Sequence, residues 1–155
     1  MASLAIIFVY NCVVASGAIL LHYEVLIRSG ILLRRMNVKS RWRVLIGICF
    51  AFFAHVVEIW LFAFAFFILV QGREFGSFSG AFDGSLLDCC YISFTTYTSL
   101  GIGDIEPHGD IRFLVGIEAL VGLVLIAWTA SFLFLQMERF WGGARSRLRT
   151  SRSGE

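Results

Sequence analysis

The sequence has few of the residues that cover the surface of soluble proteins, and few that interrupt helices. Among 155 residues only 15% are charged and one is a proline, whereas 58% are hydrophobic and sixteen are phenylalanine. In soluble domains about a quarter of the residues are charged. The low charge, together with a mean hydropathy of +0.80, excludes a soluble globular protein and predicts a chain embedded in a membrane.

The sequence also lacks the common signatures of catalysis. It contains no His-Glu-x-x-His motif, no phosphate-binding loop and no Ser/His/Asp set. Its four cysteines show no Cys-x-x-Cys spacing, and we expect all four to be small, buried, apolar side chains without a metal or redox role. We therefore predict that the chain is not an enzyme and has no cofactor, no nucleic-acid partner and no soluble ligand.

Three apolar stretches are long enough to cross a membrane as helices, since about 20 residues suffice. They cover residues 4–21, 44–70 and 112–137. His22 is expected at the end of the first helix, where amphipathic rings are common. His55 and Glu58 share a face of the second helix, because they are three residues apart. Ionisable groups at this depth usually face protein or water, and two interpretations stay open: a permanent hydrogen-bonded contact and a proton-sensitive one.

Basic residues are distributed unevenly along the chain. Of the thirteen Lys and Arg residues, six lie within residues 24–43 and five within residues 139–155. Such segments usually stay on the cytoplasmic side of a membrane. We therefore expect a basic cytoplasmic loop at 24–43 and a solvated, partly disordered basic cytoplasmic tail at 139–155. The N-terminus and the segment between the second and third helices would then lie outside a cell membrane that the chain crosses several times.

A shorter helix is predicted between the second and third apolar stretches. Residues 71–84 are polar and rich in Gly and Ser, which is typical of a surface loop. Ser85 and Asp88 form a capping box, so a helix should begin there and end near Tyr97. Roughly twelve residues are too few to span a membrane. This pattern indicates a re-entrant helix that protein surrounds, because lipid cannot satisfy the non-helical backbone after it.

The short helix leads into the sequence Thr-Ser-Leu-Gly-Ile-Gly-Asp at residues 98–104. Two glycines around one residue allow positive φ at little steric cost. Carbonyl oxygens in such a strip can all turn the same way and replace the hydration shell of a cation. With the Tyr-Ile-Ser-Phe-Thr-Thr-Tyr-Thr sequence that leads into it, and with Pro107 and Arg112 after it, the strip resembles the selectivity filter of the potassium-channel family. The usual form of that filter is Thr-Val-Gly-Tyr-Gly-Asp.

The resemblance implies an all-α membrane protein with three transmembrane helices, a re-entrant pore helix and a selectivity-filter loop. One chain holds one pore unit, as in small prokaryotic-type channels of the family, so the resemblance also implies a homotetramer in a lipid bilayer. The expected parts are a peripheral transmembrane helix with its basic loop at 1–43, a pore domain at 44–138 and the basic tail at 139–155. The implied function is passive, selective conduction of K⁺, the permeant ion.

The resemblance also implies roles for single residues. K⁺ would bind to filter carbonyls at Ser99, Leu100, Gly101, Ile102 and Gly103. The filter support and outer mouth would be Thr98, Asp104 and Glu106. On the last helix, the glycine position of the family hinge is Gly122, and Phe134 is a candidate gate on the face that runs from it through Ile126 and Ala130. For Glu118 the same two interpretations stay open as for His55 and Glu58, a structural contact and a proton-sensitive one, and it is expected to brace the back of the filter rather than to line the pore.

Three departures from the family pattern leave a second interpretation open. Ser99 stands for the filter threonine, Leu100 for valine and Ile102 for tyrosine. Isoleucine cannot make the hydrogen bond that a tyrosine hydroxyl makes behind the filter. The alternative function is therefore a poorly selective monovalent cation channel of the same architecture. The sequence shows no voltage-sensing arginine repeat and no calcium- or nucleotide-binding domain, so it predicts no gating stimulus.

Overall fold

The computed structural model describes residues 2–37, 39–72, 74–101 and 103–152. Its elements are α1 (Ala2–Arg35), α2 (Ser40–Gly72), β1 (Gly76–Gly80), α3 (Leu86–Tyr97), β2 (Ile105–Gly109) and α4 (Ile111–Arg152). Among the described residues, α1, α2 and α4 are long and apolar enough to cross a membrane. The predicted architecture of three transmembrane helices and one shorter helix is confirmed.

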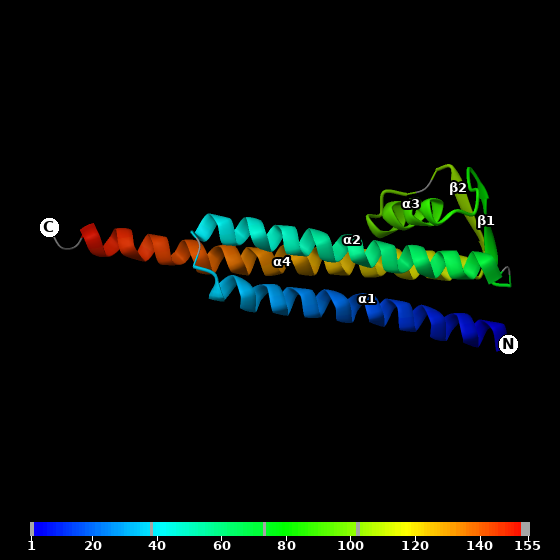
Figure 1. Cartoon of the computed structure of the whole chain (residues 1–155), viewed down its shortest axis with the longest axis horizontal. Helices are drawn as coiled ribbons and strands as arrows, with labels where there is room; N and C mark the ends of the chain where they lie inside the picture. Colours follow the sequence, from blue (N-terminus) through cyan, green and yellow to red (C-terminus); the bar gives the residue numbers. More distant parts are fainter. Residues whose placement is uncertain (1, 38, 73, 102, 153–155) are drawn as a thin grey trace.

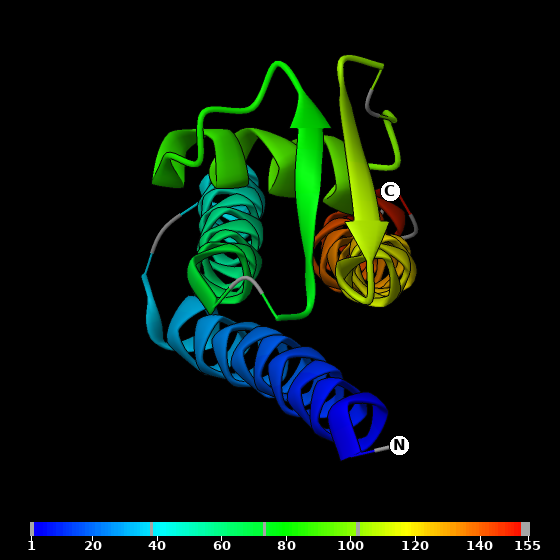
Figure 2. The same cartoon turned by 90° about the vertical axis from the view of Figure 1, so that its right-hand side faces the viewer.

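The three long helices lie side by side, and α3 packs across two of them. In the end-on view, α1 and α3 cover opposite sides of the α2–α4 pair (Figure 2). Buried apolar side chains such as Phe62 and Phe66 of α2 and Leu125 of α4 fill the interior. The N-terminus lies at the same end of the bundle as β1 and β2, and the C-terminus lies at the other end (Figure 1).

Two short strands, one before α3 and one after it, pair with each other. β1 and β2 pair antiparallel, with Gly76 opposite Gly109. At Gly76 φ is +134°, and a Cβ would lie 2.1 Å from the backbone oxygen of His108, so only glycine allows this approach. The sequence predicts a surface loop at 71–84 because this segment is polar and rich in Gly and Ser. The prediction is wrong for Gly76–Gly80, where β1 forms.

Helix α1 continues through most of the predicted basic loop. The sequence predicts a loop at 24–43, whereas the helix ends at Arg35 and the next one begins at Ser40. Leu26 and Leu33 are buried. The apolar face of α1 therefore extends beyond the first charged residues, and those residues occupy its outer face. The prediction of a loop is wrong for 24–35, because charges on one face of a helix do not end it.

Helix α4 also continues beyond its predicted end. The sequence predicts that the last helix ends near Met137 and that a partly disordered tail follows, but α4 extends to Arg152. No proline interrupts the tail, and arginine is a good helix former. The prediction of disorder is wrong for 139–152.

The cysteines divide into two pairs. Cys89 and Cys90 of α3 are buried, as expected, whereas Cys12 and Cys49 are exposed on α1 and α2. The expectation of burial is wrong for these two. A membrane helix can turn apolar side chains toward lipid as readily as toward protein.

Candidate functional site

The helix that carries the candidate site begins where the sequence predicts. The Ser85 hydroxyl accepts a hydrogen bond from the Asp88 backbone N–H at 3.1 Å, which caps α3. The Asp88 carboxylate accepts from the Asp83 N–H, and the Asp83 carboxylate accepts from the Ser85 N–H, both at 2.7 Å. Hydrogen bonds from Ser85 hold the pKa of the Asp83 carboxyl below its ordinary value. This cluster sets the first turn of α3.

At the other end of α3 the chain folds back over the last helical turn. Three backbone N–H groups donate to carbonyls of that turn: Ser99 to Thr96 at 2.9 Å, Leu100 to Thr95 at 2.9 Å, and Gly101 to Thr95 at 3.3 Å. Ser99 has a φ of +56° and Gly101 a φ of +88°, both in the left-handed region. The start of the 98–104 stretch is thus held against the negative end of the helix dipole.

The predicted ion-binding residues form an exposed strip in the single chain. Ser99, Leu100 and Gly101 are exposed, and the exposed fraction of Leu100 is 79%. Gly103 is also exposed, and nothing would lie within 4 Å of a Cβ at its position. Gly101, with its φ of +88°, uses the conformational freedom noted in the sequence. Ile102 lies outside the described residues.

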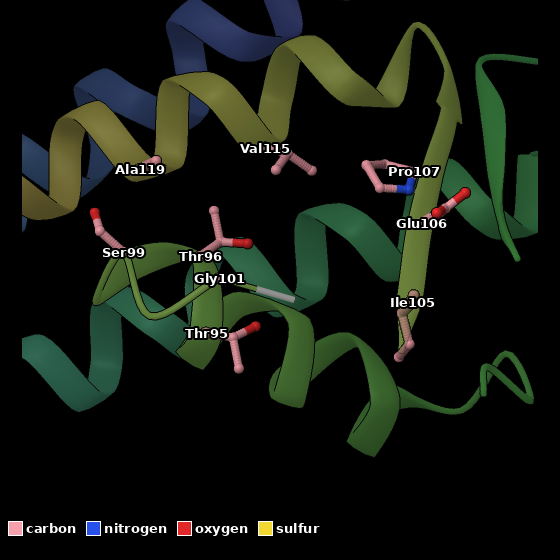
Figure 3. Close-up of a pocket in the computed structure, with 9 residues that line it drawn as sticks. All are labelled: Thr95, Thr96, Ser99, Gly101, Ile105, Glu106, Pro107, Val115 and Ala119. Carbon is pink, nitrogen blue, oxygen red and sulfur yellow. The ribbon is translucent and has the colours of Figure 1, made fainter. Parts of the chain in front are cut away.

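A hollow of about 340 Å³ lies beside this strip (Figure 3). It is lined by Thr95, Thr96, Ser99, Gly101, Ile105, Glu106, Pro107, Val115 and Ala119. These residues come from α3, the loop, β2 and α4. Within the described part of the chain the buried Thr96 hydroxyl has no hydrogen-bond partner. This face of the single chain is therefore concave and mostly apolar, with one unused hydroxyl.

The residues predicted for support and for the outer mouth lie near this strip. The Thr98 hydroxyl donates to the Phe94 carbonyl at 2.7 Å. Asp104 is exposed and accepts a hydrogen bond from the Tyr91 hydroxyl at 3.1 Å, which ties the end of the loop to α3. Glu106 is exposed on β2. Both carboxylates thus face solvent next to the strip.

Behind α3, the predicted pair His55 and Glu58 contacts the last residue of that helix, Tyr97. The Tyr97 hydroxyl donates to Glu58 Oε2 and lies 2.9 Å from His55 Nδ1. His55 Nδ1 is also 3.2 Å from Glu58 Oε2. Glu58 and Tyr97 are buried. The two residues that share a helix face in the sequence therefore meet each other and the end of the candidate pore helix.

Two residues that the sequence reasoning missed complete this cluster. His22 Nδ1 lies 2.8 Å from Glu58 Oε1. Thr129 Oγ1 of α4 lies 3.2 Å from His22 Nε2 and 3.1 Å from His55 Nε2. His22 is fully buried and lies well inside α1, so its predicted place at a helix end is wrong. The signal in the sequence that could have found His22 is that it is a polar side chain within one long apolar helix.

The third predicted carboxylate, Glu118, is fully buried between α4 and α3. The Ser93 hydroxyl of α3 bonds with Glu118 Oε1 and lies 2.7 Å from the Ile59 carbonyl. Glu118 Oε2 has no partner in the described structure. Glu118 therefore contacts α3 through Ser93, and its role as a brace of the filter stays a prediction.

At Gly122, α4 lies close to the end of α3. A Cβ at this position would lie 2.2 Å from the Tyr97 carbonyl oxygen and 3.0 Å from its Cγ. Ile126, Ala130 and Phe134 below it are exposed in the single chain. The predicted face is thus divided into two parts: Gly122 packs against α3, whereas the residues from Ile126 to Phe134 on this face are exposed. The contact explains why glycine is needed here; the roles of Gly122 as a hinge and Phe134 as a gate stay predictions.

One group of side chains has the atom types that metals bind. His22, His55 and Glu58 each place a nitrogen or oxygen within 4.8 Å of the others. Glu58 oxygens lie 2.8 Å from the His22 nitrogen and 3.2 Å from the His55 nitrogen. These are hydrogen-bond lengths. The atoms bond directly to one another, and the group is a hydrogen-bonded cluster.

Comparisons with known proteins agree with this geometry. A family model described as "Ion channel" matches residues 54–139, more than half of the chain. The match includes most of α2, all of α3, the 98–104 stretch and the apolar part of α4. No curated protein and no solved structure matches the chain.

Proposed function

This chain belongs to the ion-channel family, and on that premise we propose that it forms a homotetramer that conducts K⁺ passively across a cell membrane. The observation that carries the proposal is the exposed strip at the C-terminal end of α3, with left-handed backbone at Ser99 and Gly101. One chain offers such a strip on one side only. Four copies around an axis would surround a cation with carbonyl oxygens that replace its hydration shell.

In this proposal the backbone does the selective work. The carbonyls of residues 99–102 bind dehydrated K⁺, and the Ser99 hydroxyl adds the innermost ring. Gly103 turns the chain outward. The negative C-terminal end of α3 favours a cation in the cavity below, and the exposed carboxylates of Asp104 and Glu106 raise the local cation concentration at the mouth. Apart from the permeant K⁺, the proposed pore needs no cofactor.

The concave face beside the strip supports assembly. The hollow of about 340 Å³ has walls from α3, β2 and α4, and the buried Thr96 hydroxyl has no partner within the described chain. A neighbouring subunit would fill this hollow. Closed rotational symmetry then places all four strips around one axis.

The arrangement of charges supports the proposed orientation. The link between α1 and α2 lies at the same end of the bundle as the C-terminus, and the 98–104 loop lies toward the end that holds the N-terminus (Figure 1). Most Lys and Arg residues lie in and around that link and in the C-terminal segment. Because basic segments remain inside, the C-terminus is cytoplasmic and the N-terminus and the filter entrance are outside.

A second function is favoured by the residues of the strip itself. Ser99, Leu100 and Ile102 differ from the threonine, valine and tyrosine of the usual filter. A filter with a less constrained backbone would discriminate less between K⁺ and Na⁺. The alternative is therefore a poorly selective monovalent cation channel with the same assembly.

Two measurements on the purified full chain test this proposal. Its mass in mild detergent should be that of four copies, and a stable monomer or dimer would contradict the assembly. In a bilayer with opposed K⁺ and Na⁺ gradients, the current should reverse near the K⁺ equilibrium potential. Reversal near zero would establish the poorly selective alternative, and the absence of any current from a correctly assembled tetramer would refute both.

A further inference from the structure

A closed circuit of five side chains lies at the centre of the helix bundle. We call it the five-residue ring, and its members in order are Glu58, His22, Thr129, His55 and Tyr97. Successive members lie at hydrogen-bond distance, and Tyr97 bonds back to Glu58. All four helices contribute to it. Each member contacts the member before it and the member after it, so the protons needed to fill these contacts can be counted.

The count shows that the ring is one proton short in its ordinary ionisation state. The circuit has five contacts and needs five protons, one in each gap. A sixth contact, between His55 Nδ1 and Glu58 Oε2 at 3.2 Å, crosses the circuit beside Tyr97 and shares a proton with one of its two neighbours. Neutral His22, neutral His55, Thr129 and Tyr97 each supply one, and an ionised carboxylate supplies none. With only four protons, one gap would hold two facing lone pairs, a costly arrangement in a buried site. The fifth proton must lie on Glu58 or make one histidine doubly protonated.

We propose that the five-residue ring holds this one exchangeable proton, and that through it His22 of the first helix is a positioning residue for the pore. With the proton, every gap is closed and the net charge of the ring is zero, which suits a site in the middle of a membrane. Without it, a net negative charge remains and one contact opens. The effect on conduction rests on the proposed channel function, whereas the proton itself does not.

The ring acts on the pore through Tyr97. This residue ends α3, and the candidate filter begins two residues later at Ser99. Its backbone is also in tight contact with Gly122 of α4. Opening the contact between Tyr97 and its partners therefore releases the end of the pore helix that supports the strip. We expect conduction to decrease as the pH rises and the proton leaves.

Few other ionisable groups face the ring. From α4, Glu118 is fully buried and is bonded to Ser93 of α3. From α1, Glu24 and Arg28 pair with each other at the surface. From α2, both ionisable groups at this level, His55 and Glu58, already belong to the ring. Glu118 is thus the one outside carboxylate whose charge must be considered.

The substitution Glu58→Gln tests whether the ring holds an exchangeable proton or only a permanent hydrogen bond. A glutamine amide has the shape of the carboxyl group and carries two N–H donors that do not titrate, one of which can fill a gap of the ring. The ring of this variant has its fifth proton permanently. Its current should therefore lose the pH dependence of the parent and stay at the low-pH level. The matched control is Glu24→Gln, two residues beyond His22 but exposed on α1, which should keep the pH profile of the parent.

The deciding measurement is spectroscopic and needs no current. Nitrogen-15 spectra of the full chain in detergent at neutral pH report the protonation of its three histidines, and His108→Gln identifies the surface one. Infrared spectra report a protonated carboxyl group. The proposal requires one doubly protonated imidazole, or a carboxyl band that disappears in Glu58→Gln. Two neutral imidazoles with an ionised Glu58, or one bound transition-metal ion per chain, would overturn it.

The current measurement then tests the positioning role. If the spectra show the proton but Glu58→Gln follows the pH profile of the parent, or the parent has a flat profile from pH 5 to 9, the ring does not position the pore. If no current is seen at all, the proposed function fails while the spectra still decide whether the ring holds its proton.

Discussion

The front of α3, where the strip after the helix lies, and its back, where the five-residue ring lies, differ in how many of their contacts one chain supplies. The strip after the helix is exposed, and the described interactions hold it chiefly by backbone bonds to its own helix and by one aspartate. The five-residue ring behind the helix is largely buried, and all four helices supply it. One chain therefore completes the contacts at the back of α3 by folding, whereas the front stays exposed in the single chain.

This difference separates two kinds of mutational effect. Changes at the front should alter conduction and leave the stability of the chain nearly unchanged, because few buried contacts are lost there. Changes at the back should lower stability and alter conduction together. Gly122 contacts Tyr97, which belongs to the five-residue ring and also ends the helix before the strip. Substitution of Gly122 should therefore lower stability and alter conduction together.

The largest effect is expected for Gly101→Ala at the front. The φ of +88° at Gly101 is strained for any residue with a Cβ, although the space around it is open. The strip must change its backbone, and selective conduction should be lost while the tetramer still forms. Ion currents and mass measurements on the same preparation check both expectations.

The matched control for this variant is Gly103→Ala. Gly103 is also exposed and has open space around it. Because the φ of Gly101 lies in the left-handed region, where a Cβ is strained, the loss of conduction at Gly101 should be at least as large as at Gly103. Unchanged ion selectivity in Gly101→Ala would refute the assignment of the strip as the filter.

The next largest effect is expected for Gly122→Ala at the back. The added Cβ would lie 2.2 Å from the Tyr97 carbonyl oxygen, so α3 and α4 must move apart. Overpacking of this kind costs about 1–3 kcal/mol, and the displaced pore helix should also reduce the current. Thermal unfolding in detergent measures the first effect and bilayer recording the second.

The control for Gly122→Ala lies on the same helix. At Gly116 nothing would lie within 4 Å of a Cβ, and alanine favours helix more than glycine does. Gly116→Ala should therefore keep or slightly raise the melting temperature. A Gly122→Ala protein as stable as Gly116→Ala would mean that the contact between α4 and Tyr97 is looser than the structure indicates.

The sequence predicted α3 and the three spans well because their signals are local. Ser85 with Asp88 marks the start of α3, and the long apolar runs mark the spans. The ring could not be found in this way. Its members lie far apart in the chain, and a threonine such as Thr129 carries no special signal in an apolar helix.

The errors have physical causes that are equally specific. His22 was placed at a helix end because charges soon follow it, but Leu26 and Leu33 continue the buried face of α1. The sequence does not predict the pairing of β1 with β2, because this pairing depends on a close backbone approach at Gly76 and hardly at all on side chains. Composition reports which residues prefer lipid or water, and it does not report where a helix meets another.

A change in the half of α4 nearer the C-terminus should alter gating and leave stability almost unchanged. The side chain of Phe134 is 62% exposed in the single chain. If four such rings form a dewetted constriction, Phe134→Ala should raise the open probability severalfold. Single-channel recording checks this, with Leu135→Ala, also exposed on α4, as the control. Equal opening in Phe134→Ala and the parent would place the gate elsewhere.

The smallest effect is expected for Ser85→Ala, far from both the strip and the ring. Loss of this N-cap should cost about 1 kcal/mol without a change in ion selectivity. The pKa of Asp83 is lowered in the folded chain mainly by Ser85, so its stabilising contribution is present above the ordinary value of 3.8 and is lost as the pH falls below it. Thermal unfolding should therefore separate parent and variant more at pH 7 than in strong acid, and an equal separation at both would show that Asp83 takes no part in the cap.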